Sequence, residues 1–240
     1  MTVVVATAGE VTGTRPRRLP TVDTLGGIDT DTDGVTFVLA HPEAIDPAID
    51  DILLQAARTR WQPVPVTGTW TPAVALDQAV HAHHGDVLIA VAPGLVPRAD
   101  LTPDWLATMA ALALQPGVGL VGALVATPAD EVLLAGWEEP EFRAFQLAGL
   151  PVGTGTAGND LFIERECGQV SLAAAAVATS RWHELKHHAA TMTDWDGAGR
   201  ALSTAMRDAG LAAVWTPFAR FDRVTALDGI ADPGLTAAPA

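Results

Sequence analysis

The sequence predicts an α/β fold in which helices cover both faces of a mostly parallel central sheet. Short, continuous apolar runs at residues 35–40 and 86–91 are typical of strands that are buried on both faces. Stretches with helical spacing separate such runs, so strands and helices alternate along the chain. With 240 residues, 49% of them hydrophobic, the chain can form one domain of this class or two small ones.

The N-terminal part of the chain begins with a strand and a loop. Residues 2–8 are a short β-branched run that predicts an edge strand, and residues 9–34 are rich in Thr, Pro, Gly and Asp, which favours a long acidic loop. The elements expected after this loop and before Gly85 are a buried strand at 35–40, a helix at 47–60, a weaker strand at 63–67 and a helix at 73–83.

The C-terminal part continues the alternation, and Gly210 ends the last expected helix. The elements expected here are strands at 86–91, 118–126, 169–179 and 211–215, and helices at 101–114, 180–188 and 198–209. Small residues predominate near the C-terminus, which predicts a flexible tail. The sequence is therefore divided into an N-terminal strand and acidic loop (1–34), an α/β domain (35–227) and a tail (228–240).

The charge of the chain excludes several classes of partner. A net charge of −14, from 28 acidic and 14 basic residues, repels phosphate backbones and anionic lipid surfaces. No apolar run reaches the roughly 18 residues that span a bilayer, and the N-terminal sequence lacks the basic region of a secretion signal. The single cysteine, Cys167, cannot form an internal disulfide. These features predict a cytoplasmic protein without a membrane span that does not bind nucleic acid.

Three blocks of sequence, at 75–105, 116–137 and 176–218, follow one another in the order and spacing of a known family. The first block contains Gly85-Asp86, an apolar strand and the helix start Pro103-Asp104-Trp105. The third contains the segments AVATSRWHEL and AMRDAGLAAVWTPFA. Together the blocks resemble the family 2 glycosyltransferases of the GT-A fold, in particular bacterial rhamnosyltransferase-like members. The resemblance implies a bacterial protein with a GT-A-like three-layer sandwich, the fold of nucleotide-diphospho-sugar transferases.

The resemblance also implies where the chemistry of such an enzyme would lie. In the family, a divalent metal on an acidic triplet neutralises the diphosphate of a nucleotide sugar. An Asp at the start of the last long helix takes the proton from the acceptor hydroxyl. In this chain the triplet falls on Ala92, Pro93 and Gly94, while the base falls near Gly199 and a companion acid near Ala201. None of these residues carries a carboxylate.

The missing carboxylates predict a degenerate glycosyltransferase, a pseudoenzyme that keeps the scaffold and has lost metal-dependent transfer. We expect such a chain to act as a binding or assembly module in polysaccharide or cell-surface glycan synthesis. Its expected partner is a nucleotide sugar or another protein of glycan synthesis, and no cofactor is expected.

One alternative keeps the transferase activity. Asp194 and Asp196 lie a few residues before the expected base. A shifted loop could bring one of them into that role in an active inverting glycosyltransferase, with Mn²⁺ or Mg²⁺ at the donor site. The simpler interpretation is that Asp196 caps the last helix.

A second alternative is a zinc hydrolase. Residues 183–187 spell His-Glu-Leu-Lys-His, which matches a zinc protease motif. On one α-helix, His183 and His187 would share a face and bind zinc, and Glu184 would act as the general base. The motif lacks a third ligand at a standard spacing.

Overall fold

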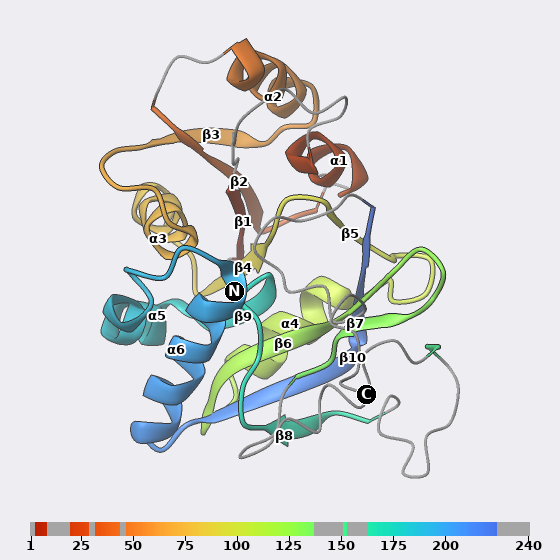
Figure 1. Cartoon of the computed structure of the whole chain (residues 1–240), viewed down its shortest axis with the longest axis vertical. Helices are drawn as coiled ribbons and strands as arrows, with labels where there is room; N and C mark the ends of the chain where they lie inside the picture. Colours follow the sequence, from red (N-terminus) through yellow and green to blue (C-terminus); the bar gives the residue numbers. More distant parts are fainter. Residues whose placement is uncertain are drawn as a thin grey trace, which may run out of the picture.

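The computed structural model describes residues 3–8, 20–28, 32–43, 47–136, 151–152 and 163–224. Within these ranges one sheet of ten strands forms the centre of the molecule (Figure 1). The strands are β1 (Val3–Ala8), β2 (Val35–Pro42), β3 (Gln62–Val66), β4 (Val87–Val91), β5 (Leu95–Pro97), β6 (Val118–Ala126), β7 (Val132–Leu134), β8 (Arg165–Cys167), β9 (Ala174–Ala178) and β10 (Ala212–Arg223). Their order is β3-β2-β1-β4-β9-β6-β10-β5, with β7 on β6 and β8 on β10.

The N-terminal half of the sheet is parallel. Strand β1 pairs parallel with both β2 and β4, and β3 continues the parallel arrangement beside β2. Strands β6 and β10 are also parallel, whereas β9 lies antiparallel between β4 and β6. Strands β5, β7 and β8 add antiparallel pairs. The predicted α/β class, with a central sheet flanked by helices, is confirmed.

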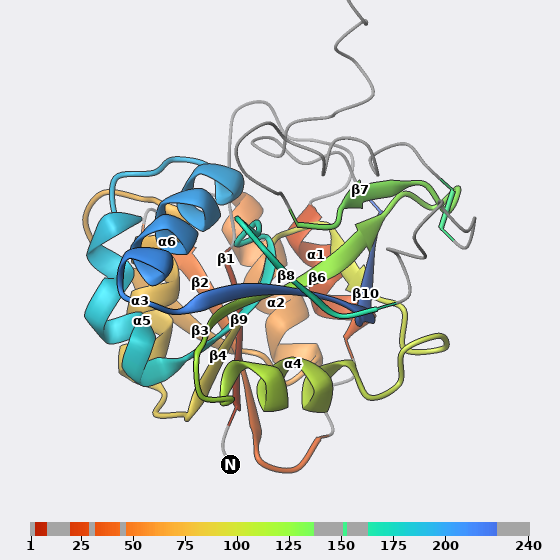
Figure 2. The same ribbon diagram turned by 90° about the horizontal axis from the view of Figure 1, so that it is seen from below.

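Helices cover both faces of this sheet (Figures 1 and 2). They are α1 (Pro20–Gly27), α2 (Pro47–Arg58), α3 (Pro72–Ala82), α4 (Trp105–Ala113), α5 (Thr179–Leu185), the 3₁₀ helix η2 (Lys186–His188) and α6 (Trp195–Asp208). Helix α6 lies with α3 and α5 on one face, where Met206 contacts Gly119 of β6. Helix α4 covers the other face, where Trp105 packs edge-on against Phe221 of β10 at 5.1 Å between ring centroids. None of the described helices is long and apolar enough to cross a membrane.

The core forms because three strands are apolar along their whole length. Every residue of β4, β6 and β9 is buried, and β9 is almost entirely alanine. Such small side chains allow helices to approach both faces of the sheet closely. Helix α3 has a favourable N-terminus. The Thr71 hydroxyl accepts a hydrogen bond from the Val74 amide, and Pro72 occupies the first turn.

Two expectations for the N-terminal region are wrong. The first strand is not an edge strand, because β1 lies between β2 and β4 inside the sheet. The expected loop at 9–34 contains helix α1, although residues 9–19 and 29–31 lie outside the described residues. Both errors have one cause: the neighbours of β1 and the packing of α1 are set by contacts that local composition does not reveal.

The C-terminal elements differ from expectation in their ends. Helix α6 begins at Trp195 and not at residue 198, and β10 runs through Pro217 to Arg223 with register shifts against β6. The register shifts allow a proline within this strand, because they interrupt the regular ladder of hydrogen bonds. The predicted tail at 228–240 lies outside the described residues. The three-part division of the chain stays a prediction.

The parallel strands define two functional edges of the sheet. We call the edge at which β1, β2, β4 and β6 end the carboxyl edge, and the edge at which they begin the amino edge. In open α/β sheets, ligands bind outside the carboxyl ends of the strands. Antiparallel β9 runs in the other direction, so that Ala174 pairs with Val91 at the carboxyl edge and Ala178 pairs with Val87 at the amino edge.

Candidate functional site

The turn that follows β4 at the carboxyl edge contains the residues predicted to stand at the place of the metal-binding triplet. Its residues, Ala92, Pro93 and Gly94, are all buried, and Gly94 has a left-handed φ of 83°. The Leu95 amide donates to the Ala92 carbonyl at 3.2 Å and closes the turn. We call these three residues the triplet turn. It presents a methyl group, a proline ring and backbone atoms, none of which is a strong ligand for a hard divalent metal.

Helix α1 forms hydrogen bonds with backbone groups of the triplet turn. The Thr24 hydroxyl accepts a hydrogen bond from the Gly94 amide at 2.8 Å and donates to the Ala92 carbonyl at 3.4 Å. A Cβ atom at Gly27 would lie only 2.4 Å from the side chain of Val96, so α1 and β5 touch through glycine. The Gly94 carbonyl accepts from the amide of Val224 at 2.9 Å. These groups therefore bond within the protein and not to a ligand.

The position expected for the catalytic base is closed by backbone packing. Gly199 lies on the buried side of α6, against residues 170–172. A Cβ atom there would lie 2.3 Å from the Val170 carbonyl oxygen and 2.5 Å from the Leu172 amide nitrogen. Contacts this short with backbone atoms do not relax by side-chain rotation. An aspartate at residue 199 would require α6 to move away from this segment. Ala201, at the companion position, is partly exposed in a groove along the outer side of α6.

The two alternative bases, Asp194 and Asp196, take part in local structure at the start of α6. Asp194 caps the helix: its carboxylate accepts a hydrogen bond from the Gly197 amide at 2.6 Å. The interpretation that Asp196 is the cap is therefore wrong. Asp196 lies in the first turn, is only 5% exposed, and accepts a 2.5 Å hydrogen bond from the Ser171 hydroxyl. The assignment of either carboxylate as a base stays a prediction.

Five charged residues at the ends of β5, β6 and β10 form a network that the sequence did not reveal. Arg220 bonds to Asp130 at 2.6 Å and to Asp222 at 3.2 Å. Arg98 bonds to Asp222 at 2.8 Å and, through two nitrogens, to Asp100. Arg220 and Asp222 are both buried. Their spacing of two residues, which places them on one face of a strand, is the signal that could have found them.

This network neutralises its own carboxylates. The hydrogen bond from Arg220 holds the pKa of the Asp130 carboxyl below its ordinary value, and Arg98 does the same to Asp100. In return, hydrogen bonds to Asp100 and Asp222 raise the pKa of the Arg98 guanidinium. A metal ion or a phosphate at this place would compete with these ion pairs. The network therefore does not replace the missing acidic triplet.

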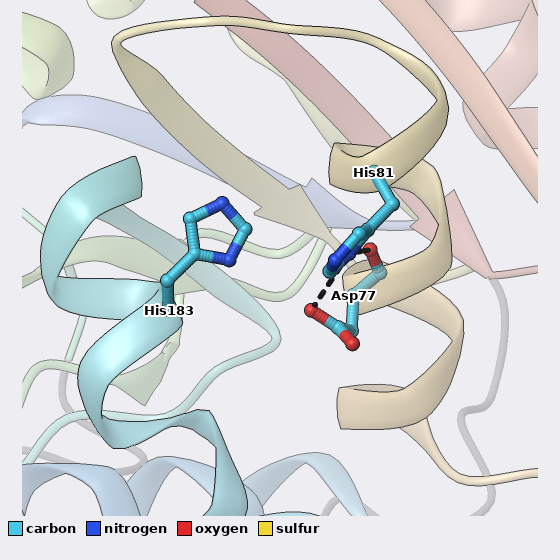
Figure 3. A group of neighbouring side chains, drawn as sticks. All are labelled: Asp77, His81 and His183. Carbon is cyan, nitrogen blue, oxygen red and sulfur yellow. Dashed lines mark hydrogen bonds and ion pairs between the residues drawn. The ribbon is translucent and has the colours of Figure 1, made fainter.

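Helices α3 and α5 bring together the only group of three His, Cys, Asp or Glu ligand atoms in the described part of the chain (Figure 3). The group consists of Asp77, His81 and His183, whose ligand atoms all lie within 4.8 Å of one another. Helix α5 ends at Leu185, and His187 lies in the 3₁₀ turn that follows. Residues 183–187 therefore do not form the helical histidine pair on which the zinc-hydrolase alternative depends.

Comparison with known proteins supports the fold. No family model matches the sequence, and no curated protein matches it. The structure resembles GalNAc-T7 in complex with UDP, GalNAc and Mn²⁺ (TM-score 0.64, 12% identity, 95% of this chain and 44% of that one). It also resembles the mannosyltransferase PcManGT of Pyrobaculum calidifontis in complex with GDP-Man and Mn²⁺ (TM-score 0.57, 17% identity, 95% and 58%). A third similar structure is a mycobacterial protein (TM-score 0.54, 18% identity, 94% and 68%).

These likenesses confirm a fold of the GT-A glycosyltransferase type. The chain covers less than two thirds of the length of the two glycosyltransferases. At 12% and 17% identity the likeness shows the fold alone. The likeness shows neither family 2 membership nor rhamnosyl specificity, and both stay predictions.

Proposed function

We propose that this chain is a degenerate GT-A module that does not catalyse metal-dependent sugar transfer and acts by binding within polysaccharide or cell-surface glycan synthesis. One observation carries the proposal: packing closes both positions at which a GT-A enzyme is expected to hold its carboxylates. The triplet turn is bonded to α1 through Thr24. Gly199 lies against the backbone of residues 170–172 with no room for a side chain. Substitution alone would not restore either group.

The charges that remain at the carboxyl edge do not compensate for this loss. The similar glycosyltransferases are complexes with Mn²⁺ and either UDP or GDP-Man. A metal in such a site stabilises the negative charge that develops on the leaving diphosphate. Here Arg98 and Arg220, two cations of the network near this edge, are both bonded to aspartates. We therefore expect any nucleotide contact by this chain to be independent of a divalent metal.

The active inverting transferase remains the competing function, and it requires two rearrangements. Asp194 would have to leave the N-terminus of α6, and the loss of such a cap costs about 1 kcal/mol. Asp196 would have to leave Ser171 and become accessible to an acceptor hydroxyl. The divalent metal, Mn²⁺ or Mg²⁺, would still lack a carboxylate in the triplet turn.

The decisive experiment is a thermal-unfolding panel. The untagged protein is heated with UDP, GDP and their sugar conjugates, each with Mn²⁺ and with a chelator, and with Mn²⁺ alone as the control for metal binding elsewhere. A ligand present at about 100 times its Kd adds roughly 2.7 kcal/mol to the free energy of unfolding. We expect no shift that needs nucleotide and Mn²⁺ together. A shift of that kind with one nucleotide would overturn the proposal and favour the transferase.

A further inference from the structure

A cluster of metal-ligating side chains lies at the amino edge, away from the triplet turn. Asp77 and His81 are one turn apart on α3, so they share a face of that helix. His183 reaches the same space from α5, and Figure 3 shows its ring beside that of His81. The two ring centroids are 5.3 Å apart at an interplanar angle of 75°. Helix α5 starts where β9 leaves the sheet beside Val87, which places the cluster at the amino edge.

We propose that this chain binds one Zn²⁺ ion between α3 and α5 through Asp77, His81 and His183. Two imidazoles and one carboxylate are a typical ligand set for zinc. Ligand atoms around a tetrahedral zinc lie about 3.3 Å apart, as bond lengths of 2.0 to 2.2 Å require. In the structure these atoms lie within 4.8 Å of one another. The His183 side chain is exposed, so its rotation can close the remaining gap while His81 keeps its contacts with Asp77.

The contacts around the cluster orient the ligands. The Nδ1 atom of His81 lies 2.9 Å from the Asp77 carbonyl oxygen. The same Nδ1 atom lies 3.3 Å from the Asp77 carboxylate, and a proton donated from Nδ1 to either oxygen leaves the lone pair on Nε2 for a metal. The buried Trp182 donates its indole N–H to the Asp77 carboxylate at 3.2 Å. In natural zinc sites, hydrogen bonds of this kind hold the metal-binding side chains in the required orientation.

A positively charged side chain of the protein competes with the zinc ion for the Asp77 carboxylate. Lys186 is the only lysine in the sequence, and its ammonium group lies 2.6 Å from the Asp77 carboxylate. A zinc ion on Asp77 must share this oxygen or displace the ammonium. Removal of Lys186 is therefore expected to tighten zinc binding. Three protein ligands leave a fourth position for water, and the nitrogen-rich set selects zinc over Mg²⁺ and Mn²⁺.

The test is a zinc titration of the chelator-treated full chain without a histidine tag, against a chromophoric zinc indicator. We expect one equivalent to bind. His81→Ala and His183→Ala should each weaken binding by more than the roughly 10- to 100-fold cost of losing an outer-shell partner. The matched controls His84→Ala and His187→Ala remove nearby histidines outside the cluster and should leave the affinity unchanged. Circular dichroism melts check that each variant folds.

A second variant pair tests the placement of the ion. Lys186→Met should bind zinc several-fold more tightly than the parent, whereas Arg58→Met, which removes an exposed charge on α2, should not. Co²⁺ in place of zinc should give the visible absorption of a four-coordinate ion, and this absorption should be absent in His183→Ala. The proposal is overturned if no single equivalent binds, if His187→Ala weakens binding and His81→Ala does not, or if both charge variants tighten it equally. Because the cluster is remote from the triplet turn, this result is independent of the nucleotide panel.

Discussion

The two edges of the sheet use their polar groups in opposite ways. At the carboxyl edge, where GT-A enzymes act, Thr24 and the arginine–aspartate network satisfy polar groups inside the protein. At the amino edge, two imidazoles of an Asp-His-His cluster remain exposed to solvent. The positions that lack the expected carboxylates are therefore also positions at which packing leaves little space. In the described residues, the group of three potential metal ligands lies at the opposite edge.

Substitution of Gly199, which packs against the backbone of residues 170–172, should change the stability of the protein most. Helix propensity alone predicts that Gly199→Ala stabilises α6 by up to about 1 kcal/mol. We expect the opposite, a loss of about 1 to 3 kcal/mol, because the new Cβ atom meets the backbone at 2.3 Å. Gly199→Asp adds a buried charge and should cost more still. The measurement is the free energy of unfolding in urea.

The control for Gly199 is Ala201→Asp on the partly exposed side of the same helix. Because this side chain can reach solvent, the change should cost less than about 1 kcal/mol. Equal stability of Gly199→Ala and the parent would mean that the base position can accept a side chain. In that case the closed carboxyl edge, and with it the proposed loss of activity, would have to be abandoned.

A smaller effect is expected at the contact between α1 and the triplet turn. Thr24→Val keeps the shape of the side chain and removes the hydroxyl, so the buried Gly94 amide loses its partner. A buried donor left unpaired costs about 1 to 3 kcal/mol. Thr24→Ser, which keeps the hydroxyl, should lose less. If the unfolding midpoints of the two variants are equal, this hydrogen bond does not hold the turn closed.

The sequence contains enough information to predict the fold class, and less to predict how the side chains at the edges of the sheet are bonded. Buried runs such as those of β4 and β6 mark strands directly, because a strand covered on both faces must be apolar. The contact of Gly27 with Val96 explains a glycine that composition alone assigned to a loop. Two aspartates at the start of α6 could both cap a helix, and only the backbone geometry selects Asp194.

The clusters were beyond the reach of local patterns. Asp77 and His183 stand far apart in the sequence, and so do Arg98 and Asp222, yet each pair meets in the fold. The histidine motif at 183–187 contains one residue of the Asp-His-His cluster, His183, whereas His187 lies outside it. The two histidines of the motif, His183 and His187, do not share one α-helix, because α5 ends at Leu185. Pairing between distant elements, and not residue type, decides which of these side chains can act together.

The smallest effect is expected for the pH dependence of stability, which tests whether the arginines at the carboxyl edge stabilise the charged carboxylates beside them. Arg220 lowers the pKa of Asp130 below its ordinary value of 3.8. A carboxyl whose pKa is lower in the folded state stabilises the fold at pH values above that ordinary value, and the stabilisation is lost as the pH falls through the folded value.

Asp130→Asn is the matched variant, because residue 130 has a left-handed φ of 63° that asparagine tolerates. Near neutral pH the variant should unfold slightly more easily than the parent, and the difference should vanish as the pH falls below the lowered pKa of Asp130 in the folded state. High salt should also reduce it, because the Asp130 side chain is 55% exposed and its ion pair is screened. A difference that persists in acid would show that Asp130 acts through the backbone turn and not through its charge.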